Sequence, residues 1–478
     1  MHKQTDEHGT DHDGRQGHEI SPLDGRYRGK TEALRPYFGE FALAEARCDV
    51  ELRYLLALER LHVFSRLSDA ERARVEASIG GLTQRQFDRI KQIEARVHHD
   101  VKACELFLRE LLELAEPNRI HFGLTSEDIN NLAYATRLRM YREEVQLPTI
   151  DKLIAGLAGK VASWKAVPFP AHTHGQTASP TTAGKELAVF LLRLARQRDQ
   201  LAKLRFRGKL GGATGTYAAF RVAAPDIDWP TFAREFVTGL DLDFNPCTTQ
   251  IEDRDGLAEY FAMTARINGI LLDLDRDVWA YLSRGYFAAR VAEGQVGSST
   301  MPHKVNPIRF ENSEGNIAVS NALLSMLADT LTHSRMQRDL SDSTVLRNVG
   351  VALTHAHLAI TEAVAGLEEI DIHRVRIDAE LERMPQVLAE AYQTALRAAG
   401  VEDPYELLRE ATQGRQVTLE TLHALLDRLG ERQEMDAETS NRLRALRPRN
   451  YIGDAVRLCD DALAAVGYSA EQDQQVDR

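Results

Sequence analysis

Apolar residues recur at every third or fourth position over long stretches of the chain, a spacing that predicts amphipathic α-helices. Four stretches show the spacing most clearly: residues 185–210, 256–282, 316–335 and 349–370. Each is about 20 residues or longer, against a mean of ~11–12 for globular helices, and each is apolar over a wide arc. Alternation typical of strands is scarce, and its best example, near 233–244, is weak. The pattern predicts a bundle of long helices that other subunits cover in part.

Prolines and glycines mark the breaks between these helices. They gather in 114–131, 164–184 and 209–230, and after residue 370 the helical patterns become shorter. We therefore expect an all-α fold with a disordered tail. The expected divisions are a tail at 1–20, an N-terminal helical domain at 21–120, a central helical bundle at 121–368 and a C-terminal helical domain at 369–478.

Composition narrows the class of protein. The 478 residues carry a formal net charge of −12 without a concentrated basic stripe, so nucleic acid is not an expected partner. The four cysteines lie far apart without a CxxC motif, which excludes a disulfide framework and favours a cytoplasmic location. No long apolar run predicts a membrane span, and the N-terminal segment lacks the apolar core of a signal peptide. Four histidines in that tail could bind metal, but their irregular spacing argues against a metal site.

Unusual polar residues collect in four short segments at the ends of the long helices. These are LTSEDIN (124–130), HTHGQ (172–176), GSSTMPHKVNP (297–307) and RMQRDLSDSTVLRN (335–348). Hydroxyls at a helix start and a lysine can bind carboxylates, arginines can hold a phosphate, and a histidine can donate a proton near neutral pH. The chain contains no phosphate-loop and no HExxH motif. Together the segments indicate an acid–base site for an anionic substrate, without a metal or an organic cofactor.

Each segment also has a purely structural interpretation. Thr125 and Ser126 are suited to capping a helix, and the two acidic residues that follow them suit the helix dipole. Arg338 and Arg347 could form ion pairs within the bundle, and His174 could simply occupy a turn. The residues by themselves leave both interpretations open.

The motifs resemble the fumarase/aspartase/argininosuccinate lyase superfamily. MPHK in the third segment resembles the adenylosuccinate lyase branch, whereas fumarase-like members usually have MPGK and argininosuccinate lyases MPQK. The matching segments follow the family order: SPLDGRYRGK (21–30), HHDVKACE (98–105), IHFGLTSEDINN (120–131), HTHGQTASPTT (172–182), TTQIE (248–252), SSTMPHKVNP (298–307) and QRDLSDSTVLRN (337–348), with PRNYIGDA (448–455) at the end.

The resemblance implies a reaction, a set of partners and an assembly. Adenylosuccinate would be split by β-elimination into AMP and fumarate, and SAICAR into AICAR and fumarate, as steps of purine biosynthesis. No metal or organic cofactor would be needed. The chain would form an all-helical homotetramer whose central domains build a twenty-helix core, and each active site would draw on three subunits.

The resemblance also implies the catalytic roles. Ser298 would be the base that removes the succinyl Cβ proton, with Lys304 stabilising its alkoxide. His174 would be the general acid that protonates the departing N6, held in its acid form by Glu311. The aci-carboxylate formed on proton removal would be bound by Lys304 together with Asn306, Thr125 and Ser126.

Further residues are assigned to substrate binding on the same basis. Those for the phosphate and sugar are Arg26, Tyr27, Arg338, Ser343 and Arg347; those for the base and succinyl group are His99, Asp100, Gln250 and Asn312; and neighbouring positions are His98, Ser299, Thr344, Val345 and Leu346. The stretch GGATGTYAAF (211–220) departs from the family pattern in its last residues, so we assign no base contact to Thr216 or Phe220.

Three alternatives differ from this hypothesis. An argininosuccinate lyase or a fumarase-like hydratase conflicts with MPHK and with the phosphate-type residues near 343–347. A catalytically inactive scaffold of the same superfamily would be favoured by loss of Ser298 or His174, and both are present. A structural bundle without a ligand would leave the polar loop segments unexplained.

Overall fold

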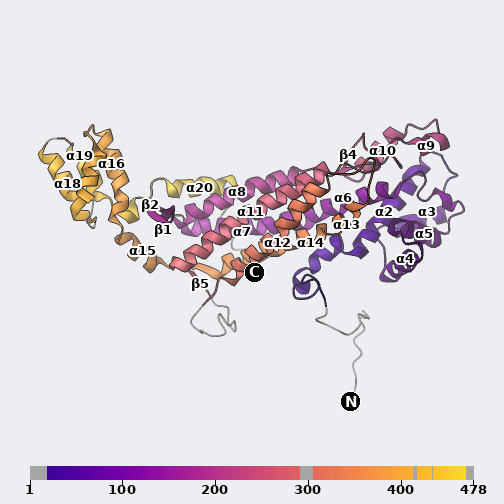
Figure 1. Cartoon of the computed structure of the whole chain (residues 1–478), viewed down its shortest axis with the longest axis horizontal. Coiled ribbons are helices and arrows are strands. Elements are labelled where there is room, and N and C mark those ends of the chain that lie inside the picture. The colour runs from indigo at the N-terminus through magenta and orange to yellow at the C-terminus, as the bar shows by residue number, and fades with distance from the viewer. Residues whose placement is uncertain (1–18, 291–304, 413–416, 433, 470–478) are drawn as a thin grey trace, which may run out of the picture. The chain divides into compact units, whose positions relative to one another are not determined.

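The computed structural model describes residues 19–290, 305–412, 417–432 and 434–469 (Figure 1). Helices dominate these residues, and the strands among them form only three two-stranded sheets. The predicted all-α class is therefore confirmed. The described residues divide into two compact units: unit 1 contains those within 19–149, 200–268 and 316–359, and unit 2 contains those within 150–199, 269–290, 305–315 and 360–469.

The long apolar patterns are helices in the structure. The four patterns correspond to helices α8 (Ala183–Lys203), α11 (Asp255–Arg284), α12 (Ile308–Thr330) and α14 (Val349–Glu369), and the structure adds a further long helix, α7 (Leu147–Trp164). Helix α12 begins earlier than its apolar pattern, at Ile308, directly after Pro307, and Glu311 in its first turn suits the helix dipole. The weak alternation near 233–244 does not form one strand. Residues 233–238 belong to helix α10 (Trp229–Thr238), where Asp228 caps a strongly amphipathic segment, and only Asp243–Phe244 pairs as the short strand β4.

Unit 1 contains a cluster of helices around one apolar core (Figure 1). The core lies between helices α2 to α5, and its largest members include Leu52, Phe107 and Leu112. Each of three helices begins at a polar cap, with Ser68, Thr83 and His99 accepting backbone hydrogen bonds. The elements that lie wholly in unit 1 are η1 (Arg28–Lys30), η2 (Glu32–Leu34), α1 (Arg35–Phe38), α2 (Glu40–Glu59), α3 (Asp69–Ser78), α4 (Gln84–Val97), α5 (Asp100–Leu112), η3 (Pro117–Arg119), α6 (Ser126–Tyr141), η4 (Arg142–Gln146), β3 (Arg207–Gly208), α9 (Ala218–Ala223), α10 (Trp229–Thr238), β4 (Asp243–Phe244) and α13 (Ser341–Leu346).

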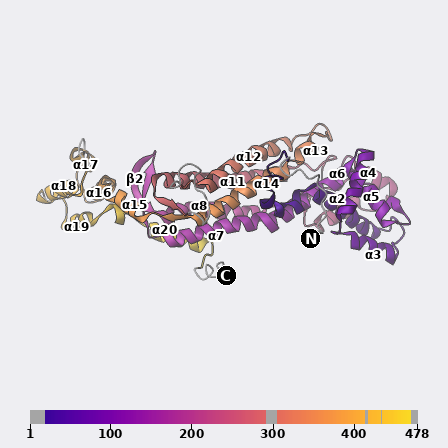
Figure 2. The same ribbon diagram turned by 90° about the horizontal axis from the view of Figure 1, so that it is seen from below.

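Unit 2 ends in a group of shorter helices, as the sequence predicts after residue 370 (Figure 2). Helices α16 to α19 share a core that includes Tyr392, Leu425 and Leu429. The elements that lie wholly in unit 2 are β1 (Pro168–Thr173), β2 (Gln176–Thr182), β5 (Phe287–Ala289), β6 (Ile370–Ile372), α15 (Arg374–Glu382), η5 (Pro385–Leu388), α16 (Ala389–Ala398), α17 (Pro404–Thr412), α18 (Leu419–Glu431), α19 (Ala437–Ala445), η6 (Pro448–Asn450) and α20 (Ala455–Ala465).

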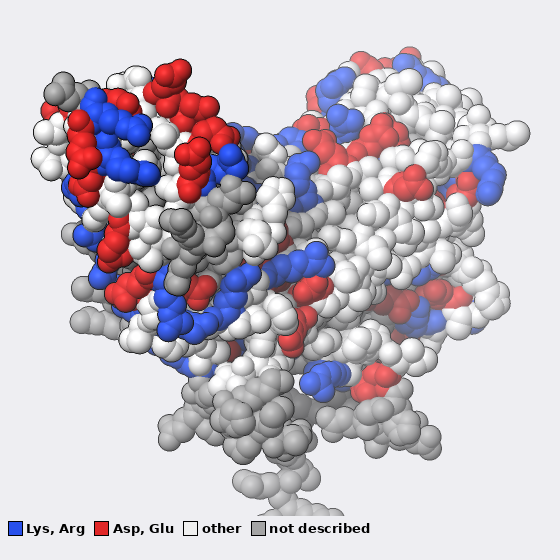
Figure 3. Space-filling model, turned by 60° about the vertical axis from the view of Figure 1, so that its left-hand side comes forward, with Lys and Arg blue, Asp and Glu red and all other residues white. Residues whose placement is uncertain are grey.

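The surface carries charges of both signs, and the most apolar helical segment is largely buried. Acidic and basic side chains are interspersed over the face that Figure 3 shows. The segment Ser341–Glu369 reaches a mean hydropathy of 1.2, sufficient by length and composition for a membrane span, but 67% of its most apolar window is buried in the fold. That degree of burial is typical of the core helix of a bundle.

Candidate active site

Ten of the residues predicted to bind substrate line one cavity of about 520 Å³ in unit 1. The chain brings them together from four segments that are far apart in the sequence: the turn between α4 and α5, the start of α6, the segment before α11, and the segment around α13. The ten residues are His98, His99, Asp100, Thr125, Ser126, Gln250, Arg338, Ser343, Thr344 and Arg347.

The N-terminus of α5 orients the ring of His99. Its Nδ1 accepts a hydrogen bond from the backbone N–H of Lys102 at 3.2 Å, so a neutral ring carries its proton on Nε2. That Nε2 lies 3.4 Å from the hydroxyl oxygen of Ser126. His99 therefore presents an N–H donor beside the Ser126 hydroxyl, in the cavity that both residues line.

Asp100, at the first position of α5, is paired with a buried arginine. Arg47 donates to Asp100 Oδ2 at 2.7 Å and to Asn130 Oδ1 at 2.9 Å, and is 7% exposed. Burial alone would raise the pKa of Asp100, but the charge of Arg47 and hydrogen bonds from Arg47 and the Val101 N–H together lower it. Asp100 is therefore a fixed negative charge at the cavity wall.

The side chain of Asp128 fixes the N-terminus of α6 through hydrogen bonds. The backbone N–H of Thr125, the N-cap residue, donates to Asp128 Oδ2 at 2.9 Å, which confirms the cap that the sequence suggests. Asp128 is fully buried and also accepts from Lys209 Nζ at 2.7 Å and from the N–H of Gly211 at 2.9 Å. First-turn N–H groups of a helix lack intrahelical partners, so this immobilised turn can bind an anion.

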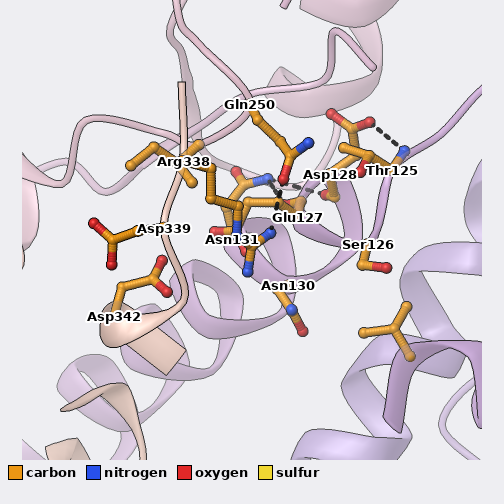
Figure 4. A network of polar contacts seen from close by, with 12 residues as sticks. Thr125, Ser126, Glu127, Asp128, Asn130, Asn131, Gln250, Arg338, Asp339 and Asp342 are labelled. Carbon is orange, nitrogen blue, oxygen red and sulfur yellow. Dashed lines mark hydrogen bonds and ion pairs between the residues drawn. The ribbon is translucent and has the colours of Figure 1, made fainter. Parts of the chain in front are cut away.

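Glu127 connects the same turn to two arginines, Arg254 and Arg338, of which Figure 4 labels Arg338. Its carboxylate is 2% exposed, with Oε1 2.7 Å from Arg254 Nη2 and Oε2 3.4 Å from Arg338 Nη1. Arg254 Nη2 also lies 2.6 Å from Asp342 Oδ2. Arg338 thus forms the ion pair that the structural interpretation expects and also lines the cavity, while its phosphate-binding role stays a prediction.

Gln250 completes this wall of the cavity. Its Oε1 accepts from Arg338 Nη1 at 3.3 Å, and its Nε2 donates to the carbonyl of Ala213 at 2.9 Å. The Gly-rich loop therefore positions a side chain of the site without lining the cavity itself. Phe220, from the end of that loop, is fully buried against Gly123 and Trp229, a packing position that agrees with assigning it no base contact.

Four predicted binding residues lie in unit 1 but do not line the 520 Å³ cavity. Arg26 is exposed and Tyr27 half-buried, in the turn that leads into η1. Val345 is half-buried in α13, and Leu346 is buried there and lines a neighbouring cavity of about 360 Å³. Their roles in substrate binding stay predictions.

His174 lies at the tip of a β-hairpin in unit 2. Strands β1 and β2 pair through Thr173 and Gln176, leaving His174 and Gly175 as a two-residue turn with φ values of 53° and 74°. Positive φ at both positions is the mark of a type I′ turn, in which glycine is favoured and histidine tolerated. The side chain of His174 is exposed. In the neighbouring His172, Nε2 lies 3.2 Å from Arg284 Nη1, and burial together with the positive charge of Arg284 lowers the pKa of His172.

The other unit 2 candidates lie at the start of α12. Glu311 is exposed and accepts from Trp279 Nε1 at 3.2 Å, while Asn306 and Asn312 are half-buried. Within the described part of one chain, no hydrogen bond joins Glu311 to His174, so their pairing stays a prediction. Ser298, Ser299 and Lys304 lie outside the described residues. No group of three or more His, Cys, Asp or Glu side chains in the described ranges is placed to hold a metal ion.

Comparison with known proteins identifies the family. The model of a lyase family matches residues 24–320, and that of the adenylosuccinate lyase C-terminal region matches residues 334–452. A fumarate lyase from Mesorhizobium superposes with a TM-score of 0.74 at 20% identity, over 91% of this chain and 97% of the other, which shows the shared fold. The helical fold and the family match together show that this chain belongs to the lyase family.

Similar curated proteins show which group of lyases the chain belongs to. The adenylosuccinate lyase of Escherichia coli strain K12 is 44% identical, over 92% of this chain and 98% of that protein. The adenylosuccinate lyase of Haemophilus influenzae is 43% identical over the same shares of the two chains. Within the lyases, the chain is thus a member of the adenylosuccinate lyase family.

Proposed function

We propose that the chain catalyses the β-elimination of fumarate from adenylosuccinate, giving AMP, and from SAICAR, giving AICAR. The observation that carries the proposal is the 520 Å³ cavity, in which a helix N-terminus, a hydrogen-bonding histidine and two arginines converge from four segments. Such a cavity suits a substrate that bears both carboxylates and a phosphate. The family membership supports the same reaction.

The two ends of the substrate would use different parts of the cavity. Arg338, Ser343 and Arg347 come from one segment and combine positive charge with a hydroxyl, which suits a phosphate. Thr125 and Ser126 stand at the positive end of the α6 dipole, which suits the succinyl carboxylate. This carboxylate gains negative charge when the Cβ proton leaves, so donors fixed here stabilise the transition state more than the bound substrate.

The proton transfers would be made by residues outside this cavity wall. Ser298 would remove the Cβ proton with Lys304 stabilising its alkoxide, and His174 would protonate N6. His174 is exposed at the tip of a two-residue turn, so its side chain could reach the active site of another subunit. Glu311 would fix its ring in the acid form. No step requires a metal or an organic cofactor.

We further propose the assembly and location that the family implies. The chain would act as a cytoplasmic homotetramer with a twenty-helix core, three domains divided near residues 120 and 368, and active sites shared by three subunits. Exposed apolar side chains on α8, α11 and α12, namely Val189, Trp279 and Val319, support subunit contacts along these helices. Nucleic acid and membranes would not be partners.

An assay of the purified protein tests the proposed function. Adenylosuccinate is supplied, and AMP and fumarate are separated by chromatography, with argininosuccinate and malate as parallel substrates. Release of AMP and fumarate from adenylosuccinate alone is the expected result. No turnover by a folded tetramer, as measured by light scattering, would contradict the proposal and favour an inactive scaffold.

A further inference from the structure

Arg254 joins two segments of the candidate site without lining the cavity. Its Nη2 lies 2.7 Å from Glu127 Oε1, at the start of α6, and 2.6 Å from Asp342 Oδ2, in the segment that carries Arg338 and Ser343. The side chain of Arg254 is 4% exposed, and Glu127 and Asp342 are 2% and 8% exposed. One buried guanidinium therefore connects the proposed carboxylate-binding end to the proposed phosphate-binding end.

The charges of this cluster balance. Glu127 and Asp342 carry two negative charges, and Arg254 and Arg338 carry two positive charges. Burial disfavours the charged form of Arg254, but the two carboxylates outweigh it and raise the pKa of the guanidinium. Removing one partner of such a buried pair leaves a charge without compensation, which is far more costly than removing both.

Arg254 also determines how strongly Glu127 attracts Arg338. With Arg254 present, Glu127 Oε1 has a close partner at 2.7 Å, and Arg338 Nη1 stays at 3.4 Å from the other oxygen, within 3.3 Å of Gln250. Without Arg254, Arg338 is the remaining cation beside a buried carboxylate. A guanidinium drawn toward Glu127 is turned away from the cavity and from an anion bound there.

We propose that Arg254 is a positioning residue, which holds Glu127 so that Arg338 stays available to the phosphate of the substrate. The inference rests on the proposed function for the identity of the substrate. It assigns no contact with the substrate to Arg254. Loss of Arg254 should therefore weaken binding of the phosphate end more than it slows the elimination itself.

The test measures steady-state kinetics with adenylosuccinate and, separately, AMP affinity by calorimetry. Arg254→Gln is expected to raise KM and the AMP dissociation constant by roughly tenfold or more, with kcat changed by less than about threefold. Arg254→Lys keeps the positive charge on a shorter side chain, so its KM should lie between those of the wild type and Arg254→Gln. Arg89→Gln is the matched control, because Arg89 makes a bidentate pair with Glu110 at the surface of the same unit, and its KM should equal that of the wild type.

A second variant separates positioning from general stability. Glu127→Gln added to Arg254→Gln removes the carboxylate that attracts Arg338, so KM and AMP affinity should return to within about threefold of the wild type. If Arg254 only stabilised the fold, the double variant would not recover KM or AMP affinity. An unchanged KM in both single variants, or a double variant that binds no better than Arg254→Gln, would overturn the inference. Should the wild type lack lyase activity, the proposed function fails, and the AMP affinities still decide the role of Arg254.

Discussion

Asp275 is a buried carboxyl group that forms no ion pair with any residue in the described part of the chain. It lies on α11, is 1% exposed, and neither carboxyl oxygen has a well-formed hydrogen bond among the described residues. Burial raises the pKa of Asp275 to about 8, the Ser313 hydroxyl opposes this shift, and the charge of Glu314 adds to it. Replacing Asp275 with Asn keeps the shape of the side chain and removes its ionisation.

The direction of the pH effect follows from the two pKa values. The unfolded chain releases the Asp275 proton near pH 3.8, while the folded chain keeps it until about pH 8. Between these values the folded state binds the extra proton, so stability falls by about 1.4 kcal/mol per pH unit as the pH rises. From pH 3.8 to pH 7 the loss of stability amounts to roughly 4 kcal/mol per chain. Asp275→Asn should therefore stabilise the protein increasingly from pH 5 to pH 8.

Thermal unfolding of wild type and Asp275→Asn at pH 5, 6, 7 and 8, at one protein concentration, measures this difference. Other titrating groups are common to both proteins, so they cancel. Asp277→Asn is a graded control on the same helix, because burial raises the pKa of Asp277 only to about 6, and its effect should stop growing near that pH. A difference between wild type and Asp275→Asn that stays constant across the series would refute the reasoning, as would a wild type that is the more stable protein at pH 8.

Three further substitutions test the site and its supports. His174→Ala should lower kcat by roughly 10²–10⁴-fold with the tetramer intact, the range expected for a lost general acid; near-normal turnover in the chromatographic assay would contradict the role. Lys209→Met leaves Asp128 buried without its cation and should cost about 3–5 kcal/mol in urea unfolding, with recovery when Asp128→Asn is added. Gly215→Ala should destabilise the loop, because φ is +72° and a Cβ would lie 2.1 Å from the Thr248 carbonyl. Gly256→Ala, on α11 with open space around it, should be neutral or stabilising in the same measurement.

The fold class could be predicted from the sequence because helical periodicity is a local property. Helices α11 and α14 fall within two residues of their apolar patterns at both ends, and α8 begins within two residues of its pattern but ends at Lys203. The β1–β2 hairpin was missed, since its turn is His174-Gly175 rather than a common hairpin pair, and its strands are rich in Pro and Thr. Tertiary packing decides such short strands, and no local spacing reveals it.

The lining of the cavity was also predictable, but its supporting charges were not. The lining residues stand in motifs with unusual polar composition, and these motifs resemble a known family. Arg254, Asp342 and Lys209 look like ordinary surface charges in the sequence, because nothing local indicates that they are buried. Only the fold shows that Arg254 pairs with Glu127, that Lys209 pairs with Asp128, and that Asp342 pairs with Arg254.

This pairing resolves a conflict at the start of α6. Two carboxylates, Glu127 and Asp128, directly follow the hydroxyls that are proposed to bind a carboxylate of the substrate, and unneutralised they would repel it. The structure gives each one a buried cation, Arg254 for Glu127 and Lys209 for Asp128. The acidic residues can then fix the helix cap and the adjoining loops while the helix dipole and first-turn N–H groups face the anion. Loss of Lys209 should therefore weaken anion binding at Ser126 as well as the fold, and added salt should restore little of the affinity, because the carboxylate of Asp128 is buried.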